Sequence, residues 1–176
     1  YGNTKKSCED AIRDSGIKHI IFRYFNLAGA DPENDIGENH VPETHLIPRI
    51  LQNSEPVEIY GTTYDTEDGT CVRDYVHVCD VADAHLKAHH YLKGNNDSII
   101  LNLGTGKGTS VLGIINLVSE ITDTKVEFDL MPKRKGDPAS LTADISLAKK
   151  VLKYRPKHDI ISIIRTANEW HKTQNV

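Results

Sequence analysis

A tyrosine and a lysine four residues apart open the chain, and together they can form an acid–base pair. On a helix, Tyr1 and Lys5 would project from the same face, because side chains four residues apart are neighbours there. A free phenol has a pKa of about 10, and a nearby ammonium group stabilises the phenolate. A tyrosine in such a position can remove a proton near neutral pH. The spacing alone is more often that of a surface pair, so the surrounding residues must decide.

A helix and a strand are the elements expected to position this pair. Apolar residues share one face over residues 2–15, and Gly16 is suited to end such a helix. A strand is predicted over residues 19–25. Residues 30–43 are rich in Asp, Glu, Asn, Gly and Pro without periodicity, which predicts a long loop of the kind that is usually functional. A short helix over residues 44–52, interrupted near its proline, should follow.

The rest of the chain alternates between strand and helix patterns. Strands are predicted over residues 58–60, 72–78, 99–103 and 126–130, and helices over residues 81–92, 111–121, 145–152 and 160–172. Asp80 and Ser110 can cap the helices that follow them. Strands separated by helices predict an α/β fold with parallel pairing wherever a helix crosses over.

Composition and charge favour one soluble domain that binds neither nucleic acid nor a membrane. The 176 residues include 21 Lys and Arg against 25 Asp and Glu, whereas a nucleic-acid site usually shows as a basic excess. The longest apolar runs fall short of the roughly 18 residues that a membrane span needs, and the start of the chain has no signal-peptide pattern. The three cysteines are unevenly spaced, which favours reduced thiols in a cytoplasmic protein.

Two further motifs suggest ligand binding but do not have the required spacing. Gly104–Gly108 follows a strand and precedes a helix, as phosphate loops do, but Thr109 stands where a dinucleotide fingerprint needs glycine. We interpret it as a turn. His85 and His89 could hold a metal from one helix face, but a metalloprotease carboxylate does not follow His85. Solvated histidines are the simpler interpretation.

Longer motifs supply the context that the Tyr1–Lys5 spacing lacks. Residues 1–5, Tyr-Gly-Asn-Thr-Lys, and residues 23–26, Arg-Tyr-Phe-Asn, resemble the extended short-chain dehydrogenase/reductase superfamily. Residues 58–61, 64–70 and 72–78 resemble the UDP-galactose 4-epimerases of that superfamily. The motifs occur in family order and at family spacing over essentially the whole chain.

The resemblance implies the C-terminal part of an NAD-binding Rossmann-like fold plus a smaller α/β domain that binds a UDP-sugar. Residues 1–28 would end the Rossmann domain, and residues 29–176 would form mainly the UDP-sugar domain, with residues 72–103 returning to the Rossmann sheet. The glycine-rich loop for NAD normally precedes the tyrosine, so we expect a C-terminal half that is inactive alone. The full-length protein is expected to be a cytoplasmic homodimer that needs no metal.

The resemblance also implies a reaction, the interconversion of UDP-galactose and UDP-glucose. NAD would oxidise the sugar transiently at C4, giving a 4-keto sugar that is reduced again from its other face. Tyr1 would be the base, Lys5 would hold the nicotinamide ribose, and the backbone of Phe25 would meet the nicotinamide end of NAD. Residues implied to bind the UDP-sugar are Asn26, His45, Leu46, Glu58, Ile59, Tyr60, Arg73, Arg134, Asp137 and Leu141.

Two of these positions depart from the family pattern. His45 stands where an Asn or another small polar side chain is frequent, although a histidine can still donate a hydrogen bond. Leu141 stands at a gate where a bulky aromatic excludes N-acetylated sugars and a small side chain admits them. Because leucine is intermediate in size, we expect some tolerance of UDP-N-acetylglucosamine.

Two other interpretations stay open at this point. One is a different NAD-dependent enzyme on the same scaffold, either a nucleotide-sugar 4,6-dehydratase or a 4-epimerase for other sugars. The other is a non-catalytic domain that binds a UDP-sugar or pairs with a partner. UDP-sugar binding without turnover would favour the second.

Overall fold

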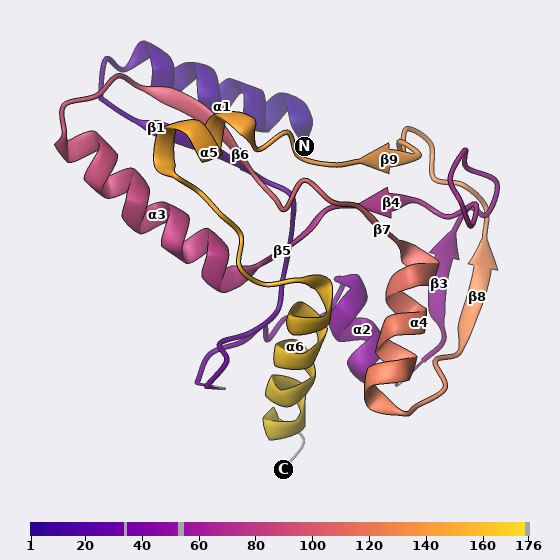
Figure 1. Ribbon diagram of the computed structural model, residues 1–176. Coiled ribbons are helices and arrows are strands. Elements are labelled where there is room, and N and C mark those ends of the chain that lie inside the picture. Colours follow the sequence, from indigo (N-terminus) through magenta and orange to yellow (C-terminus); the bar gives the residue numbers. More distant parts are fainter. Residues whose placement is uncertain (34, 53–54, 175–176) are drawn as a thin grey trace.

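Parallel strand pairs form the framework of the chain in a computed structural model that describes residues 1–33, 35–52 and 55–174 (Figure 1). β1 (Ile20–Tyr24) pairs with β6 (Ile99–Leu103), β2 (Asn26–Ala28) with β5 (Tyr75–His77), and β3 (Val57–Tyr60) with β8 (Phe128–Met131). The intervening helices make the crossovers that parallel pairing requires. The α/β fold expected from the sequence is confirmed.

A small mixed sheet connects these pairs. β4 (Val72–Arg73) pairs in parallel with β9 (Ser140–Leu141) and antiparallel with β7 (Thr109–Ser110). The expected single strand over residues 72–78 is therefore divided, because the chain changes partners at Asp74. β2, β7 and β9 were not expected, since strands of two or three residues leave no periodic pattern.

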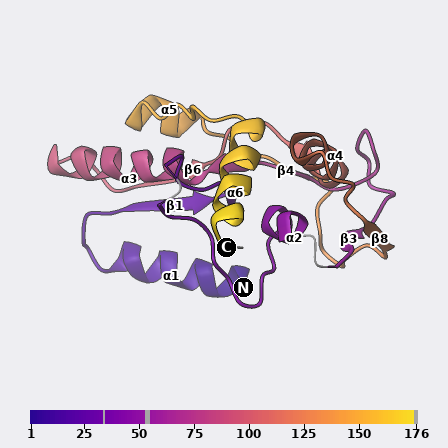
Figure 2. The same cartoon turned by 90° about the horizontal axis from the view of Figure 1, so that it is seen from below.

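Helices cover both faces of the β1–β6 pair. α1 (Gly2–Asp14) lies on one face and α3 (Val78–Lys93) on the other, with α5 (Ser146–Leu152) beside α3 (Figures 1 and 2). α2 (Leu46–Gln52), α4 (Val111–Thr122) and α6 (Ile160–Gln174) pack on one another away from that pair. Among the described residues, no helix is both long enough and apolar enough to cross a membrane.

Helix starts agree with the sequence at α4 and differ at α3. The Ser110 hydroxyl accepts a hydrogen bond from the Gly113 amide, as expected for a cap. α3 begins earlier than predicted because His77, not Asp80, caps it, with Nδ1 accepting from the Cys79 amide. Pro48 does not interrupt α2, because it lies in the first turn, where a backbone amide has no helical partner.

Two apolar clusters make up the core. One lies among α2, β3, α4 and α6 and includes Ile114, Ile163 and Ile164, all 0% exposed. The other lies among α3, β6 and α5. Tyr75 and Val76 are neighbours on β5 and belong to different clusters, because strand side chains alternate between faces.

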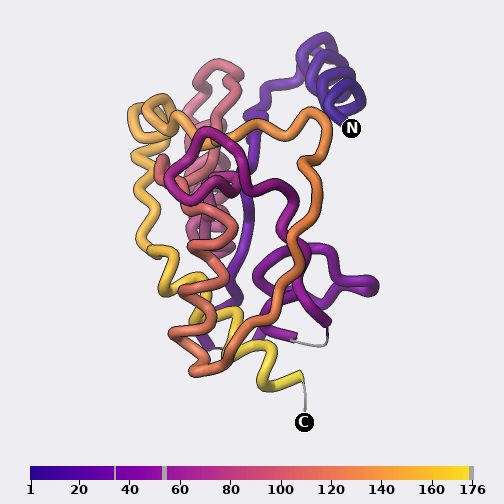
Figure 3. The backbone as a smooth tube through the Cα atoms, turned by 90° about the vertical axis from the view of Figure 1, so that its right-hand side faces the viewer, coloured from indigo at the N-terminus to yellow at the C-terminus, as the bar shows by residue number. Residues whose placement is uncertain are grey.

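α1 stands apart from both clusters, at the opposite end of the molecule from the C-terminus (Figure 3). Of its 13 described residues, none is buried. The Arg23 guanidinium of β1 donates two hydrogen bonds, of 2.8 and 2.6 Å, to the Glu9 carboxylate of α1. Polar contacts therefore help to hold this helix against its strand.

Candidate functional site

A cavity of about 530 Å³ opens beside the first residue of α1. The predicted site residues that line it are Tyr1, Phe25, Asn26, His45, Leu46 and Leu141. They come from separate parts of the sequence: the start of α1, the β1–β2 junction, the start of α2 and β9. The fold thus brings six of the thirteen residues expected to bind NAD or the UDP-sugar to one cavity.

The β1–β2 junction positions Phe25 and Asn26 at the cavity. The Phe25 amide donates to the Leu103 carbonyl (3.0 Å), and the Asn26 amide donates to the Asp74 carbonyl (2.9 Å). The backbone therefore stops pairing with β6 at Phe25 and begins pairing with β5 at Asn26. Such a switch at the carboxyl end of a parallel strand is where α/β sheets usually bind ligands.

The Tyr1–Lys5 pair has the geometry that its spacing predicts. The Lys5 amide donates to the Tyr1 carbonyl (3.0 Å), and the Lys5 Nζ lies 5.3 Å from the centroid of the Tyr1 ring. That distance is within cation–π range. Tyr1 also lines the cavity of about 530 Å³. A second cavity of about 620 Å³, between α1 and β1, is lined by Tyr1, Lys5 and Phe25.

Two other tyrosines line the first cavity but are unsuited to take a proton. Burial raises the pKa of Tyr24, and it raises the pKa of Tyr75 to about 12. The Tyr24 hydroxyl lies 2.9 Å from the His85 Nε2, while the His85 Nδ1 contacts the Val81 carbonyl (2.8 Å). The ring nitrogen facing Val81 must carry the proton, so Nε2 accepts from Tyr24. His85 is thereby engaged by Tyr24 and Val81.

The remaining predicted residues form a second group at β3, β4 and the segment after β8. The Arg134 guanidinium carbon lies 3.6 Å from the centroid of the Tyr60 ring, in a stacked cation–π contact. The Tyr60 hydroxyl donates to Glu58 (2.9 Å). Ile59 is 1% exposed and packs in the core, so its side chain cannot reach a ligand and only its backbone could.

Arg73 joins this second group to the cavity. Its guanidinium donates to the carbonyls of Val72 and Pro138, each at 2.9 Å, and lies 3.9 Å from the Asp137 carboxylate. Arg73 is also opposite Leu141 in the β4–β9 register. The two groups of predicted residues therefore lie on connected strands.

The glycine-rich turn after β6 binds a buried carboxylate. Asp74 is 0% exposed and accepts hydrogen bonds from the Thr105 amide and hydroxyl, from the Gly106 amide and from the Ala143 amide. A Cβ at Gly104 would lie 2.6 Å from the Asp74 Oδ2, so glycine is required there. These amides are engaged by Asp74, which supports interpreting residues 104–108 as a structural turn.

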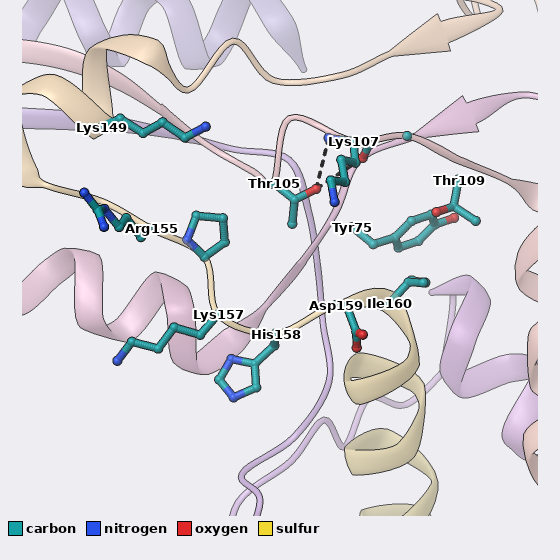
Figure 4. A pocket seen from close by; sticks show the side chains of 12 residues that line it. Tyr75, Thr105, Lys107, Thr109, Lys149, Arg155, Lys157, His158, Asp159 and Ile160 are labelled. Atoms are coloured by element: carbon teal, nitrogen blue, oxygen red, sulfur yellow. Dashed lines mark hydrogen bonds between the residues drawn. The ribbon is translucent and has the colours of Figure 1, made fainter.

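A larger cavity, of about 840 Å³, lies beside that turn (Figure 4). The segment between α5 and α6 lines one side of this cavity, and Tyr75 lies on the other side. Arg155 and Lys157, which belong to that segment, point away from Tyr75. None of the described residues lining this cavity belongs to the predicted site. We therefore place the candidate site in the cavity beside Tyr1, although it is smaller.

Sequence reasoning missed several residues of that cavity, notably Glu38 and Tyr75. Glu38 lies in the segment between β2 and α2, which forms a loop as expected, apart from residue 34, which lies outside the described residues. Nothing in its composition distinguishes one acidic residue from another. Tyr75 belongs to the predicted strand over residues 72–78. The direction of its side chain could not be predicted, because the sequence does not show that this strand is divided at Asp74.

Comparisons with known proteins agree with this arrangement. Residues 4–104 match the NAD dependent epimerase/dehydratase family. The UDP-glucose 4-epimerase of Rhizobium meliloti is 43% identical over 183 residues, covering 99% of this chain and 56% of that protein. The one from Lactobacillus helveticus is 44% identical over 182 residues, covering 98% of this chain and 55% of that protein.

Solved structures match equally well. A UDP-glucose 4-epimerase from Stenotrophomonas maltophila, with bound NAD and formylated UDP-arabinopyranose, matches with a TM-score of 0.94 at 39% identity, over 99% of this chain and 55% of that one. An enzyme from Bifidobacterium longum in complex with NAD⁺ and UDP matches at 0.91 and 30% identity, over 99% and 55%. The chain thus spans about half the length of the relatives it matches. It belongs to the NAD dependent epimerase/dehydratase family.

Proposed function

We propose that the whole protein containing this chain interconverts UDP-galactose and UDP-glucose by transient oxidation at sugar C4. The observation that carries the proposal is the convergence of Tyr1, Phe25, Asn26, His45 and Leu141 on one cavity. The names of the relatives support the same reaction.

The residues beside the second cavity suit the nicotinamide end of NAD. A phenol, an ammonium group and an aromatic ring, from Tyr1, Lys5 and Phe25, line a space of about 620 Å³. The Lys5 ammonium can donate to ribose hydroxyls, and the backbone of Phe25 can contact the nicotinamide end. When bound, NAD supplies a hydride acceptor and donor for C4.

Tyr1 moves the proton in this scheme. As hydride leaves C4, Tyr1 takes the proton of the 4-hydroxyl, the O–H bond breaks and a C4 carbonyl forms. After the 4-keto sugar has turned over, hydride adds to its other face and Tyr1 returns the proton to O4. Lys5 keeps a positive charge near the Tyr1 ring, which favours the phenolate during the step. Tyr24 and Tyr75 keep their protons because burial raises the pKa of both.

The second group of residues would hold the UDP part of the substrate. Arg73 and Arg134 can bind the pyrophosphate, because a guanidinium group matches phosphate oxygens in pairs. Asp137 can accept from the uridine ribose hydroxyls. The Tyr60 ring, which stacks under Arg134, would help to position that guanidinium.

The domain and assembly expectations belong to the same proposal. Residues 1–28 would complete an NAD-binding domain, and residues 29–176 would form mainly the UDP-sugar domain, with residues 72–103 in the Rossmann sheet. The two core clusters support such a division, since β6 and α3 belong to one and β3 and α6 to the other. We also propose a cytoplasmic homodimer that acts in galactose metabolism and whose interface includes α1.

The test is a Tyr1→Phe substitution in the full-length protein, with Tyr91→Phe on α3 as the matched control. The rate of UDP-galactose conversion should fall by about 10²–10⁴-fold in Tyr1→Phe, because a positioned acid–base group contributes that much. Tyr91→Phe should convert at the unaltered rate, and both variants should retain bound NAD. Full activity in Tyr1→Phe would overturn the role of Tyr1, and a 4-keto-6-deoxy product would identify a dehydratase instead.

A further inference from the structure

Two glutamates and two histidines of the β2–α2 segment converge at the edge of the candidate site. We call Glu38, His40, Glu43 and His45 the His–Glu cluster. Each residue offers one oxygen or nitrogen atom, and these atoms all lie within 4.8 Å of one another. The His45 Nδ1 contacts the carboxylates of both Glu38 and Glu43, the latter at 3.2 Å. The His40 and His45 rings are stacked, with centroids 5.3 Å apart.

Glu43 is the most buried member of the His–Glu cluster and has an unused oxygen. Its side chain is 4% exposed. The Oε1 atom accepts from the amides of Thr44 and His45, each at 2.7 Å, which fixes the carboxylate in place. The Oε2 atom is buried and has no hydrogen-bond partner among the described residues. Leaving a buried polar atom without a partner costs free energy, so this oxygen is expected to bind a ligand.

The charges of the His–Glu cluster point to a cation as that ligand. Among the described residues, no lysine or arginine forms an ion pair with Glu38 or Glu43. Two carboxylates this close repel each other unless a positive charge lies between them. The neighbouring backbone is held, since the Trp170 Nε1 donates to the Glu38 carbonyl (2.9 Å).

We propose that the His–Glu cluster binds one zinc ion. Two imidazoles and two carboxylates are a ligand set that zinc accepts in tetrahedral geometry, whereas magnesium and calcium prefer oxygen ligands alone. Zinc ligands lie about 2.0–2.2 Å from the metal, so the four atoms must draw closer together. The imidazoles can rotate, because His40 and His45 are 58% and 53% exposed, while the buried Glu43 stays fixed.

The ion would be structural and does not depend on the proposed reaction, which needs no metal. It would cross-link residues 38–45 of the loop that leads into α2. It would also fix the orientation of the His45 ring, which lines the cavity beside Tyr1. Metal binding can be measured without turnover, so its outcome is independent of the epimerase assay.

The test uses the full-length protein, freed of metal by a chelator and titrated with zinc or cobalt sulfate. Zinc affinity is measured by competition with a chromogenic chelator, and cobalt coordination is followed by its visible absorption. We expect one zinc per chain and the intense absorption of four-coordinate cobalt. His40→Gln and Glu43→Gln should each weaken zinc binding by at least about tenfold.

The matched control is His89→Gln, which removes an exposed histidine from α3, outside the His–Glu cluster. It should bind zinc as tightly as the unaltered protein. His40→Gln tests the proposal even if Glu43→Gln fails to fold, because the His40 side chain is largely exposed. Zinc affinity that is unchanged in His40→Gln, or equally reduced in His89→Gln, would overturn the proposal. Absence of stoichiometric binding would overturn it too.

Discussion

The edge formed by α1 and the region formed by α2, α4 and α6 are built in opposite ways. None of the 13 described residues of α1 is buried, whereas Ile114, Ile115 and Val118 of α4 are at most 2% exposed. The helix that carries Tyr1 and Lys5 thus adds little to the stability of this chain. The region proposed to hold the UDP part has an apolar core of its own. In this chain, the residues proposed to act on the substrate and the most deeply buried residues lie in different parts.

Paired alanine substitutions should show this difference most strongly. Ile163 of α6 is 0% exposed, and Ile163→Ala should lower the free energy of unfolding by about 2–5 kcal/mol through the cavity that it leaves. Ile12 of α1 is 42% exposed, and Ile12→Ala should change it by less than about 1 kcal/mol. Urea denaturation of both variants measures the two values. Equal losses would show that α1 is packed as firmly as α6.

The packed region was also the more predictable from sequence. α4 and α6 each show a regular apolar stripe, and Ser110 caps α4 as its type and position suggest. α1 was predicted equally well as a helix, although its apolar face does not by itself reveal what covers it. Burial depends on contacts between distant segments, and local periodicity does not report them.

The contact between α6 and the start of α3 should respond to acid. His77 of β5 is fully buried, and burial lowers its pKa to about 4. Its Nδ1 accepts from the Cys79 amide at the start of α3, and its Nε2 lies 3.0 Å from the Thr166 hydroxyl of α6. A proton on Nδ1 would remove that cap, so the native state resists protonation.

The sign of the effect follows from the direction of this shift. The unfolded histidine takes up a proton near pH 6.5, while the native one stays neutral until about pH 4. The His77 contribution to stability is therefore complete above pH 6.5 and is lost as the pH falls towards 4, by about 1.4 kcal/mol per pH unit. Urea midpoints measured from pH 7 to 4 check this. His77→Asn can still cap the helix but does not titrate, so its stability should fall less steeply.

The residues of the candidate site and of the helix starts were predicted unevenly, as the segment from Val72 to Val78 illustrates. Tyr1, Lys5 and Arg73 belong to local motifs that a sequence displays directly. The sequence did not reveal that His77 caps α3, because the run from Val72 to Val78 alternates like one strand and Asp80 is a frequent cap type. The His–Glu cluster lies in a loop without periodicity, so its convergence depends on the packing of that loop against Trp170.

The smallest predicted effect concerns substrate choice at Leu141. This side chain lines the cavity and is 47% exposed. Leu141→Tyr in the full-length protein should lower kcat/KM for UDP-N-acetylglucosamine relative to UDP-galactose by about tenfold or more, because the larger ring takes up space near the sugar. Leu147→Tyr, an exposed leucine on α5, is the control and should leave the ratio unchanged. An unchanged ratio in Leu141→Tyr would show that this position does not face the sugar.

The buried carboxylate of Asp74 has a consequence for how such a site can evolve. It lies between Arg73 and Tyr75 in sequence and holds the Ala143 amide, two residues beyond Leu141. The positions of Arg73, of Tyr75 in the cavity wall and of the candidate gate residue Leu141 therefore all depend on Asp74. A mutation that displaces Asp74 would move all three residues together, so new substrate preferences are most accessible through replacement of single side chains on an unchanged backbone.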